Sequence, residues 1–422
     1  MTSFKSLAIF PVLMIALAAC QTNNPPFSGP AKAPKAKVEY TPAKTEVGGL
    51  TIDVDPRVDI LFVIDDSRSM RNHQKNLSRN IHLFVNELAK IKNLDFHIGY
   101  TLVHDSHRYG PIVEKECGGT VNWEDPGTLK VIRELPENRR FVTSHDDFRQ
   151  ILSRALDPDV NTNLVKDLIN KDATHMCASG PEEEELFTPL LGSLENAMIV
   201  NGANKGFRRP GALFVAILIS DAKDASGLAP ETVWDRVQRA IGDTQKARVF
   251  TIGFKPGMVI GTSQPGFDSC KPDPAWAVNR RWPTRLVIGP RDNPLARLAE
   301  LSQDDNSSTG GHVLSICEAD YGTTLARFGT QIRQDALREI IVPLPSGVQE
   351  TKDSKNRLRV VIGNQELTEG ENGHWVYNTM NDSIVIFAQR IDWEKFNGQK
   401  IQIIFTPVQG NSPDTKPTWQ QR

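Results

Sequence analysis

Residues 58–70 read VDILFVIDDSRSM, and this stretch decides the fold of the chain around it. Its apolar part, Val58 to Ile64, is short and rich in β-branched side chains, which is typical of a strand buried on both faces. We therefore expect a central strand of a parallel sheet. Asp65, Ser67 and Ser69 follow at alternate positions of the turn that opens the next helix, so their oxygen atoms can converge.

Strand and helix patterns alternate from this strand onward. Apolar residues at helical spacing run from Leu77 to Ile91, and an apolar strand follows from Phe96 to Val103. Further helices are expected near 189–200, 231–241, 295–301 and 323–337, and further strands near 213–220, 249–254 and 312–316. This alternation predicts the α/β class, with an open, mainly parallel, doubly wound sheet.

The polar residues after the first strand have the chemistry of a cation site. A carboxylate and two hydroxyls offer hard oxygen ligands, which suit Mg²⁺, Mn²⁺ or Ca²⁺. The alternative is that Ser67 or Ser69 only caps the helix. Asp221 strengthens the first interpretation, because it follows the strand 213–220 and ligands of open α/β sheets lie at the carboxyl ends of the strands.

These residues resemble the metal-ion-dependent adhesion site of the von Willebrand factor A (VWA) domain. Its Asp, Ser, Ser motif matches at Asp65, Ser67 and Ser69, and its later aspartate matches at Asp221. Arg68 stands where the family usually has glycine. The resemblance covers residues 55–342, and it implies a bound dication, Mg²⁺ above all, with an open position that an Asp or Glu carboxylate of a protein partner completes.

The middle ligand of the family, a threonine, has two candidates here. Thr188 precedes a predicted helix as the family threonine would, although flanking glycines are missing and Thr188 with Pro189 also reads as a helix cap. The alternative lies in the run Glu182 to Glu185, where one carboxylate would replace the threonine and lower the positive charge of the site.

The start of the chain has the layout of an export signal. Lys5 precedes an apolar run from Leu7 to Ala16, and residues 1–19 are predicted to be removed. The sequence Leu17 to Cys20 resembles a bacterial lipobox, which implies lipid attachment at Cys20 and membrane anchoring. Gln21 is compatible with sorting to the outer membrane, on either face. Residues 20–50, rich in Pro, Ala, Lys and Thr, are expected to form a flexible tether.

Other segments lie outside the α/β pattern. Residues 345–407 alternate as a small antiparallel β domain, and 408–422 read as a disordered tail. Insertions are expected near 106–185 and 257–290. Four cysteines remain after Cys20, and two disulfides are expected, with the chain order favouring Cys117 with Cys177 and Cys270 with Cys317 among three possible connectivities.

Charge and motifs restrict the function. A formal net charge of -2 argues against nucleic-acid binding. The sequence has no phosphate-cradling glycine loop, no Gly-x-Ser-x-Gly elbow and no histidine pair on a predicted helix, so we expect no enzyme. The resemblance implies a lipid-anchored, cation-dependent protein-binding or adhesion module at the bacterial cell envelope. The alternatives are a static component of an envelope or surface complex, or a metal-dependent hydrolase.

Overall fold

A computed structural model gives the arrangement of most of the chain. It describes residues 37–41, 48–53, 56–67, 70–91, 94–103, 124–160, 184–195, 197–242, 247–253, 259–260, 285–286, 293–303, 312–318, 321–337, 339–344, 358–379, 382–393, 395–396 and 399–405. The expected signal peptide, Cys20 and the expected tail lie outside these residues. No helix in the described ranges is long and apolar enough to cross a membrane.

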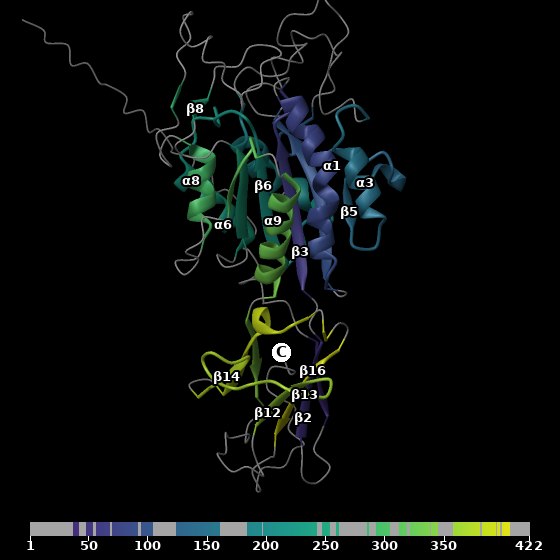
Figure 1. Cartoon of the computed structure of the whole chain (residues 1–422), viewed down its shortest axis with the longest axis vertical. Helices are drawn as coiled ribbons and strands as arrows, with labels where there is room; N and C mark the ends of the chain where they lie inside the picture. Colours follow the sequence, from purple (N-terminus) through teal and green to yellow (C-terminus); the bar gives the residue numbers. More distant parts are fainter. Residues whose placement is uncertain are drawn as a thin grey trace, which may run out of the picture.

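A six-stranded sheet forms the centre of the larger domain (Figure 1). In spatial order its strands are β10 (Val313–Ser315), β7 (Ala247–Gly253), β6 (Leu213–Ile219), β3 (Arg57–Ile64), β4 (Asp95–Leu102) and β5 (Phe141–Thr143). All neighbours are parallel except β4 and β5, which pair antiparallel at the edge. The expected α/β class is therefore confirmed, and the strand predicted at 58–64 lies inside the sheet, between β4 and β6.

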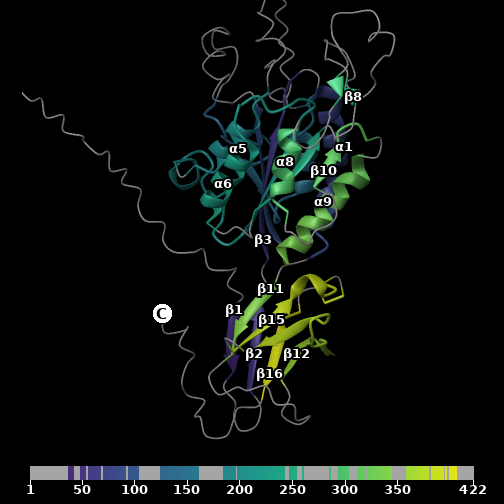
Figure 2. The same ribbon diagram turned by 90° about the vertical axis from the view of Figure 1, so that its left-hand side faces the viewer.

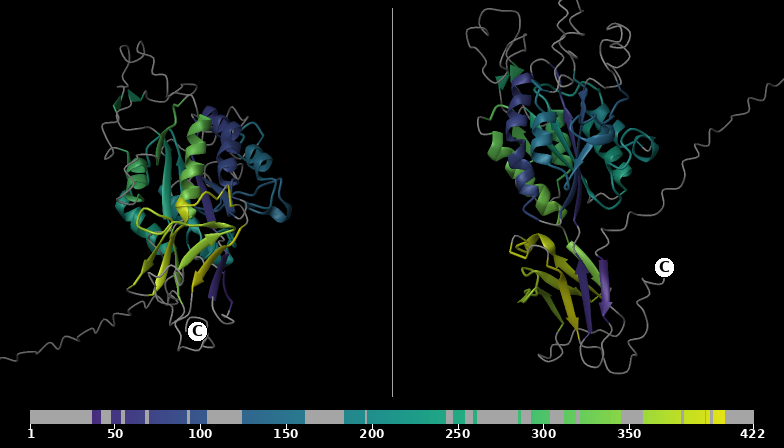
Figure 3. Two further views of the ribbon diagram at one scale, coloured as in Figure 1. Left: turned by 60° about the horizontal axis from the view of Figure 1, so that its bottom comes forward. Right: turned by 90° about the vertical axis from the view of Figure 1, so that its right-hand side faces the viewer.

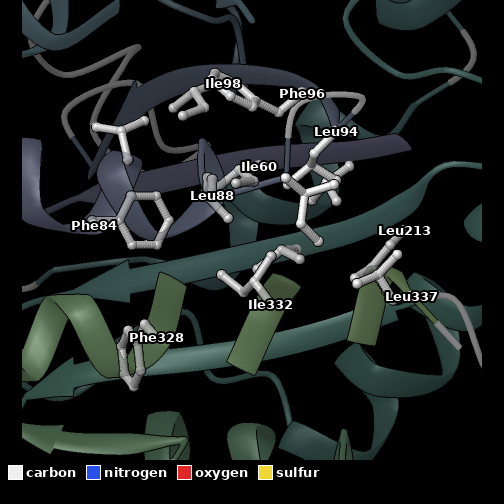
Figure 4. Close-up of a cluster of buried hydrophobic side chains, with 14 of the residues drawn as sticks. Ile60, Phe84, Leu88, Leu94, Phe96, Ile98, Leu213, Phe328, Ile332 and Leu337 are labelled. Carbon is white, nitrogen blue, oxygen red and sulfur yellow. The ribbon is translucent and has the colours of Figure 1, made fainter. Parts of the chain in front are cut away.

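Helices cover both faces of the sheet, as Figure 2 shows from the side. The helices are α1 (Arg71–Leu88), α3 (Phe148–Ala155), α5 (Phe187–Ser193), α6 (Pro230–Ile241), α8 (Pro294–Leu301) and α9 (Tyr321–Ala336), with short 3₁₀ turns at Pro136–Asn138 and Ala388–Arg390 and a π turn at Ala197–Asn201. One buried cluster joins Ile60 and Phe62 of β3 to α1, α3 and α9. Figure 4 shows Ile60 of this cluster with Phe84 of α1 and Phe328 of α9. A second cluster joins Leu61 and Val63 to α5, α6 and α8. Successive residues of β3 thus enter opposite cores, which is the doubly wound arrangement.

The strand order reverses between β3 and β6. From β3 the chain builds outward through β4 to β5, and then returns to the other side of β3 to form β6, β7 and β10. In doubly wound sheets a crevice opens at such a reversal, at the carboxyl ends of the strands. Asp65 directly follows β3 and Asp221 is the second residue after β6, so both lie at this point.

The smaller unit consists of two antiparallel sheets, and Figure 3 shows it at the end of the α/β domain where β3 begins. One sheet has the order β1 (Lys37–Thr41), β2 (Gly48–Asp53), β16 (Ile401–Phe405), β12 (Arg359–Ile362) and β13 (Gln365–Glu366). The other has the order β11 (Glu339–Pro343), β15 (Ser383–Phe387) and β14 (Trp375–Asn378). Both ends of the chain therefore contribute to this unit, and the α/β domain is inserted between β2 and β11.

Part of the segment expected to be a tether is folded instead. Residues 37–41 and 48–53 are strands, and β2 pairs with β16, which places Leu50 opposite Ile403. Leu50 and Ile52 are fully buried. The prediction of a tether to residue 50 was wrong here because two short strands have no strong local signal: β1 pairs with β2, and the other partner of β2 is β16, at the other end of the chain. Likewise, β11 belongs to the β unit, which begins before the predicted residue 345.

The first expected insertion also contains elements of the sheet. Residues 141–155 supply the edge strand β5 and the helix α3, which are too short to give a strong periodic pattern. In the second insertion, β8 (Val259–Ile260) pairs antiparallel with β9 (Arg285–Leu286). Cys317 is disulfide-bonded. Cys117, Cys177 and Cys270 lie outside the described residues, so the two pairings remain predictions.

A charged network fixes the edge of the sheet that faces the β unit. Arg209 donates from Nε to Asp59 Oδ1 at 2.8 Å and from its backbone N–H to Asp59 Oδ2 at 2.6 Å. Arg209 also pairs with Asp95. Asp59 is 1% exposed, and burial raises its pKa to about 6 although the Arg209 charge acts against this. The guanidinium thus joins the loop before β6 to β3 and β4.

Arg209→Ala should destabilise the protein by about 3–5 kcal/mol, because it leaves the Asp59 carboxylate buried without this partner. Urea unfolding measures the loss. The control is Arg239→Ala, which breaks an exposed pair with Asp235 on α6 at 2.9 Å and should change stability by less than about 0.5 kcal/mol. Similar values for the two variants would contradict the role given to Arg209.

Leu50→Ala should lower stability by about 2–5 kcal/mol, because it empties space in a packed core. The control is Val200→Ala, whose side chain is 54% exposed and whose loss should cost less than about 0.5 kcal/mol. Thermal and urea unfolding give both values. If Leu50→Ala left the stability unchanged, residues 48–53 would have to be part of the flexible tether and not a strand of the β unit.

Candidate metal centre

Asp65 is the central residue of the site because the backbone holds it between two strands. Its N–H donates to Ile219 O of β6 at 2.9 Å, which continues the β3–β6 pairing one residue past β3. The side chain is fully buried. Gln74, itself 1% exposed on α1, donates from Nε2 to Asp65 O at 2.8 Å. The backbone of Asp65 is therefore held from the neighbouring strand and from the following helix.

Two donors orient the Asp65 carboxylate. Ser67 N–H donates to Oδ1 at 2.8 Å, within the turn that leaves β3. Ser220 Oγ donates to Oδ2 at 2.7 Å, from the residue that follows β6. Ser220 Oγ also accepts from Ala222 N–H at 2.9 Å, so its hydroxyl is fixed in turn. A hydrogen bond between residues 65 and 220 joins the two motif segments that sequence reasoning placed at the same edge.

Negative charge is concentrated around Asp65. Burial, together with the charge of Asp221, raises the pKa of Asp65 to about 7. Burial also raises the pKa of Glu184 to about 10, and the charges of Asp65, Asp221 and Asp66 contribute. These carboxylates repel one another at short range. A divalent cation would remove the repulsion, and oxygen-only ligands are those that Mg²⁺, Mn²⁺ and Ca²⁺ accept.

The structure describes some of the predicted metal ligands and not others. Ser67 is buried beside Asp65, and Asp221 is half-buried. Ser69 lies outside the described residues, as does Arg68. In the part of the chain that is described, no group of three or more His, Cys, Asp or Glu side chains could hold a metal ion as it stands. An ion here would therefore need serine oxygens, or a small movement of a carboxylate.

Thr188 and the glutamate run occupy different places. Thr188 is half-buried on α5, and its hydroxyl donates to Glu185 Oε2 at 3.1 Å. Glu184, by contrast, interacts electrostatically with Asp65 and Asp221. The choice between Thr188 and a glutamate of this run as the middle ligand therefore stays a prediction. Sequence reasoning proposed the run but could not choose within it, because the choice depends on how the segment before α5 packs.

Asp224 has a structural task next to the site. Its Oδ1 accepts from the N–H groups of Leu186 at 2.7 Å and Phe187 at 2.9 Å, at the start of α5. Glu184 O accepts from Ala225 N–H at 2.7 Å. The segment before α5 is therefore attached to the loop after β6. Nothing in the sequence pattern pointed to Gln74 or to the role of Ser220, since both residue types are common on surfaces.

Comparisons with known proteins give low similarity. No protein-family model matches the chain, and no curated protein sequence matches it. Among solved structures, a von Willebrand factor type A protein from Catenulispora acidiphila is 13% identical, with 86% of this chain and 61% of that chain covered and a TM-score of 0.35. Proximal thread matrix protein 1 from the mussel byssus, with a zinc-occupied MIDAS motif, is 14% identical at 68% and 50% coverage, with a TM-score of 0.32.

A pilus adhesin, SpaC from Lactobacillus rhamnosus GG in its open conformation, is 11% identical at 90% and 43% coverage, with a TM-score of 0.32. The chain thus spans between about two fifths and three fifths of the length of these structures. At such scores the matches carry no argument about function, and the fold rests on the strand order described above.

In chelator, the stability of the protein should fall as pH rises from about 3.8 to about 7. The folded state holds the Asp65 proton in this window while the unfolded state has lost it, so rising pH favours unfolding. Urea unfolding at several pH values measures the slope. Asp65→Asn should reduce the slope without abolishing it, because Asp59 and Glu184 also have raised pKa values, and an unchanged slope would contradict the raised pKa of Asp65.

Proposed function

We propose that this chain is a lipid-anchored, divalent-cation-dependent protein-binding module of the bacterial cell envelope. The α/β domain would hold the cation at the reversal point of its sheet, in the manner of the adhesion site of VWA domains. Asp65, Ser67, Ser69 and Asp221 would supply oxygen ligands, Mg²⁺ being the expected ion, and an Asp or Glu carboxylate of a protein partner would complete the coordination.

One observation carries the proposal: Ser220 donates to the carboxylate of Asp65 at the point where the strand order reverses. The two halves of the motif lie far apart in the sequence, and no local preference would bring them together. A helix cap alone would explain a serine after β3, but not a buried aspartate turned toward the end of a second strand. The raised pKa values of Asp65 and Glu184 support the presence of a cation in the working protein.

A binding role suits this site better than catalysis. The polar groups that surround Asp65 in the described residues are carboxylates, serine hydroxyls, an amide and backbone N–H groups. Such a set holds a hard ion and leaves one position for an incoming oxygen. We therefore expect the protein to catalyse no reaction at this site. The lipid at Cys20 would keep the protein, and therefore its partner, at the cell envelope, on whichever face of the membrane the protein occupies.

A static component of an envelope complex is the competing function. The arrangement that favours it is the insertion of the α/β domain into the β unit, which makes the two parts a continuous body with a shared apolar cluster. In that case the partner would bind without any ion. Retention of the partner on membranes in the presence of chelator would support this second function over the first.

Calorimetric titration of the purified protein with Mg²⁺, Mn²⁺ and Ca²⁺ tests the proposal. We expect one saturable ion, and we expect Asp65→Ala and Asp221→Ala each to weaken its binding by at least about tenfold. The control is Asp235→Ala, which removes an exposed carboxylate on α6. Absence of binding by the unaltered protein, or equal binding by all variants, would contradict the proposal and favour the static component.

A further inference from the structure

A pocket of about 370 Å³ lies at the end of α3, the helix beside the edge strand β5 in Figure 1. It is lined by Tyr100 of β4, by residues 131–134 of the segment between β4 and β5, and by the end of α3 with Val160. None of its lining residues is among the predicted metal ligands. Pockets that hold small organic ligands have volumes of about 300 to 1,000 Å³. The pocket therefore has room for about 12 non-hydrogen atoms, if each takes the volume of a water molecule.

The inner wall of the pocket is apolar and belongs to the protein core. Tyr100, Ile132 and Ala155 are buried, and all three are members of the cluster that joins β3 to α1, α3 and α9. Lys130 N–H donates to Tyr100 O at 2.9 Å, which attaches the segment before β5 to β4. Leu135 N–H donates to Ile132 O at 3.0 Å, which closes a turn. The pocket is thus already formed, so a ligand has little of the chain to order when it binds.

The rim of the pocket carries an apolar side chain that is open to water. Val160 is 45% exposed, and its N–H donates to Asp157 O at 3.1 Å. Asp159, the residue before it, accepts from Arg71 Nη2 at 3.0 Å and pairs with Lys75 Nζ at 2.7 Å. These contacts fix the segment against α1. An apolar ligand would cover the Val160 side chain and remove it from water, which is favourable.

The charged groups of the pocket are mainly cationic. Arg133 and Arg154 contribute two guanidinium groups, and Glu134 contributes one carboxylate. Arg154 Nε lies 3.4 Å from Glu134 Oε1, and this pair connects the two sides of the pocket. Arg133 is exposed and has no ion pair within the described part of the chain. One positive charge is therefore left over, and a guanidinium can bind a carboxylate through two parallel hydrogen bonds.

We propose that this pocket binds an organic carboxylate with an apolar body. Arg133 receives the carboxylate beside Arg154, and the apolar body lies against Tyr100 and is covered by Val160. Such a group occurs in a free carboxylic acid and also at the end of a protein chain whose last residue is apolar. The site needs no ion and shares no residue with the candidate metal centre, so it does not depend on the proposed function.

Ligand-detected NMR titration of the purified protein in chelator tests this proposal, because chelator removes any ion that could bind a carboxylate elsewhere. 4-Phenylbutyrate should bind with a Kd of about 0.1–1 mM, as expected for a ligand of this size. 4-Phenylbutanol has the same body without the charge and should bind at least about tenfold more weakly. Equal binding of the acid and the alcohol, or no binding of the acid at about 10 mM, would overturn the proposal.

Two variants locate the binding. Arg133→Gln should weaken the binding of 4-phenylbutyrate by about five- to tenfold, because it removes a guanidinium. Ala155→Leu should abolish the binding, because the larger side chain fills the pocket. Circular dichroism and thermal melting check that both variants are folded. If Ala155→Leu is unfolded, the exposed Arg133→Gln still decides the matter.

Arg236→Gln is the matched control, since it makes the same change at an exposed arginine. Arg236 lies on α6, which packs in the second buried cluster, on the other face of the sheet. This variant should bind 4-phenylbutyrate as the unaltered protein does. An equal loss of affinity in Arg236→Gln and Arg133→Gln, or no loss in Arg133→Gln, would contradict the role given to Arg133.

N-acetylphenylalanine and its amide distinguish the two sources of the carboxylate. If the acid binds at least as tightly as 4-phenylbutyrate and the amide does not bind, the pocket recognises the end of a protein chain. If the acid binds much more weakly than 4-phenylbutyrate, the pocket recognises a free carboxylic acid. If the acid and the amide bind equally well, the carboxylate is not recognised and the proposal fails.

Discussion

The pairing of β3 with β4 on one side and β6 on the other is the constraint on which the structure depends. It buries β3 on both faces, separates the two helix layers, and fixes where the chain must reverse its order. It also sets the register that brings Ile219 O opposite Asp65 N–H. A shift by one residue would send Asp65 to the other face of the sheet and away from Ser220.

The sequence was sufficient wherever the signal was local. The apolar run before Asp65 predicted a central strand, and the spacing after it predicted α1; both exist with small changes at their ends. The sequence was insufficient where pairing is between distant segments. Strand β2 pairs with β16 at the far end of the chain, β1 pairs with β2, and β5 is three residues long. At the site, Asp65 and Asp221 could be placed at one edge, whereas the sequence left open whether Thr188 or a glutamate before α5 joins them.

The candidate centre shows why acidic residues are tolerated in a buried place. Desolvation opposes the ionised forms of Asp65 and Glu184, and the charge of Asp221 acts in the same direction on both. Without a cation, such a cluster lowers stability at neutral pH. Its retention next to an ordered serine and an ordered glutamine is understandable if charge compensation comes from outside the chain. The folded protein would then gain from the ion what it loses from the repulsion.

The insertion of the α/β domain between β2 and β11 has a mechanical consequence. After β2 of the β unit, the next strand along the chain is β3, and Asp65 follows the last residue of β3. A pull between the start of the chain and the edge that carries Asp65 runs along the axis of β3, while its hydrogen bonds to β4 and β6 lie across that direction. Under such a pull the hydrogen bonds of β3 would be loaded in shear and would have to break together. They would not break one after another, as they do when a strand is pulled away from its neighbour. The domain would thus be oriented to resist tension between the proposed anchor and the proposed contact.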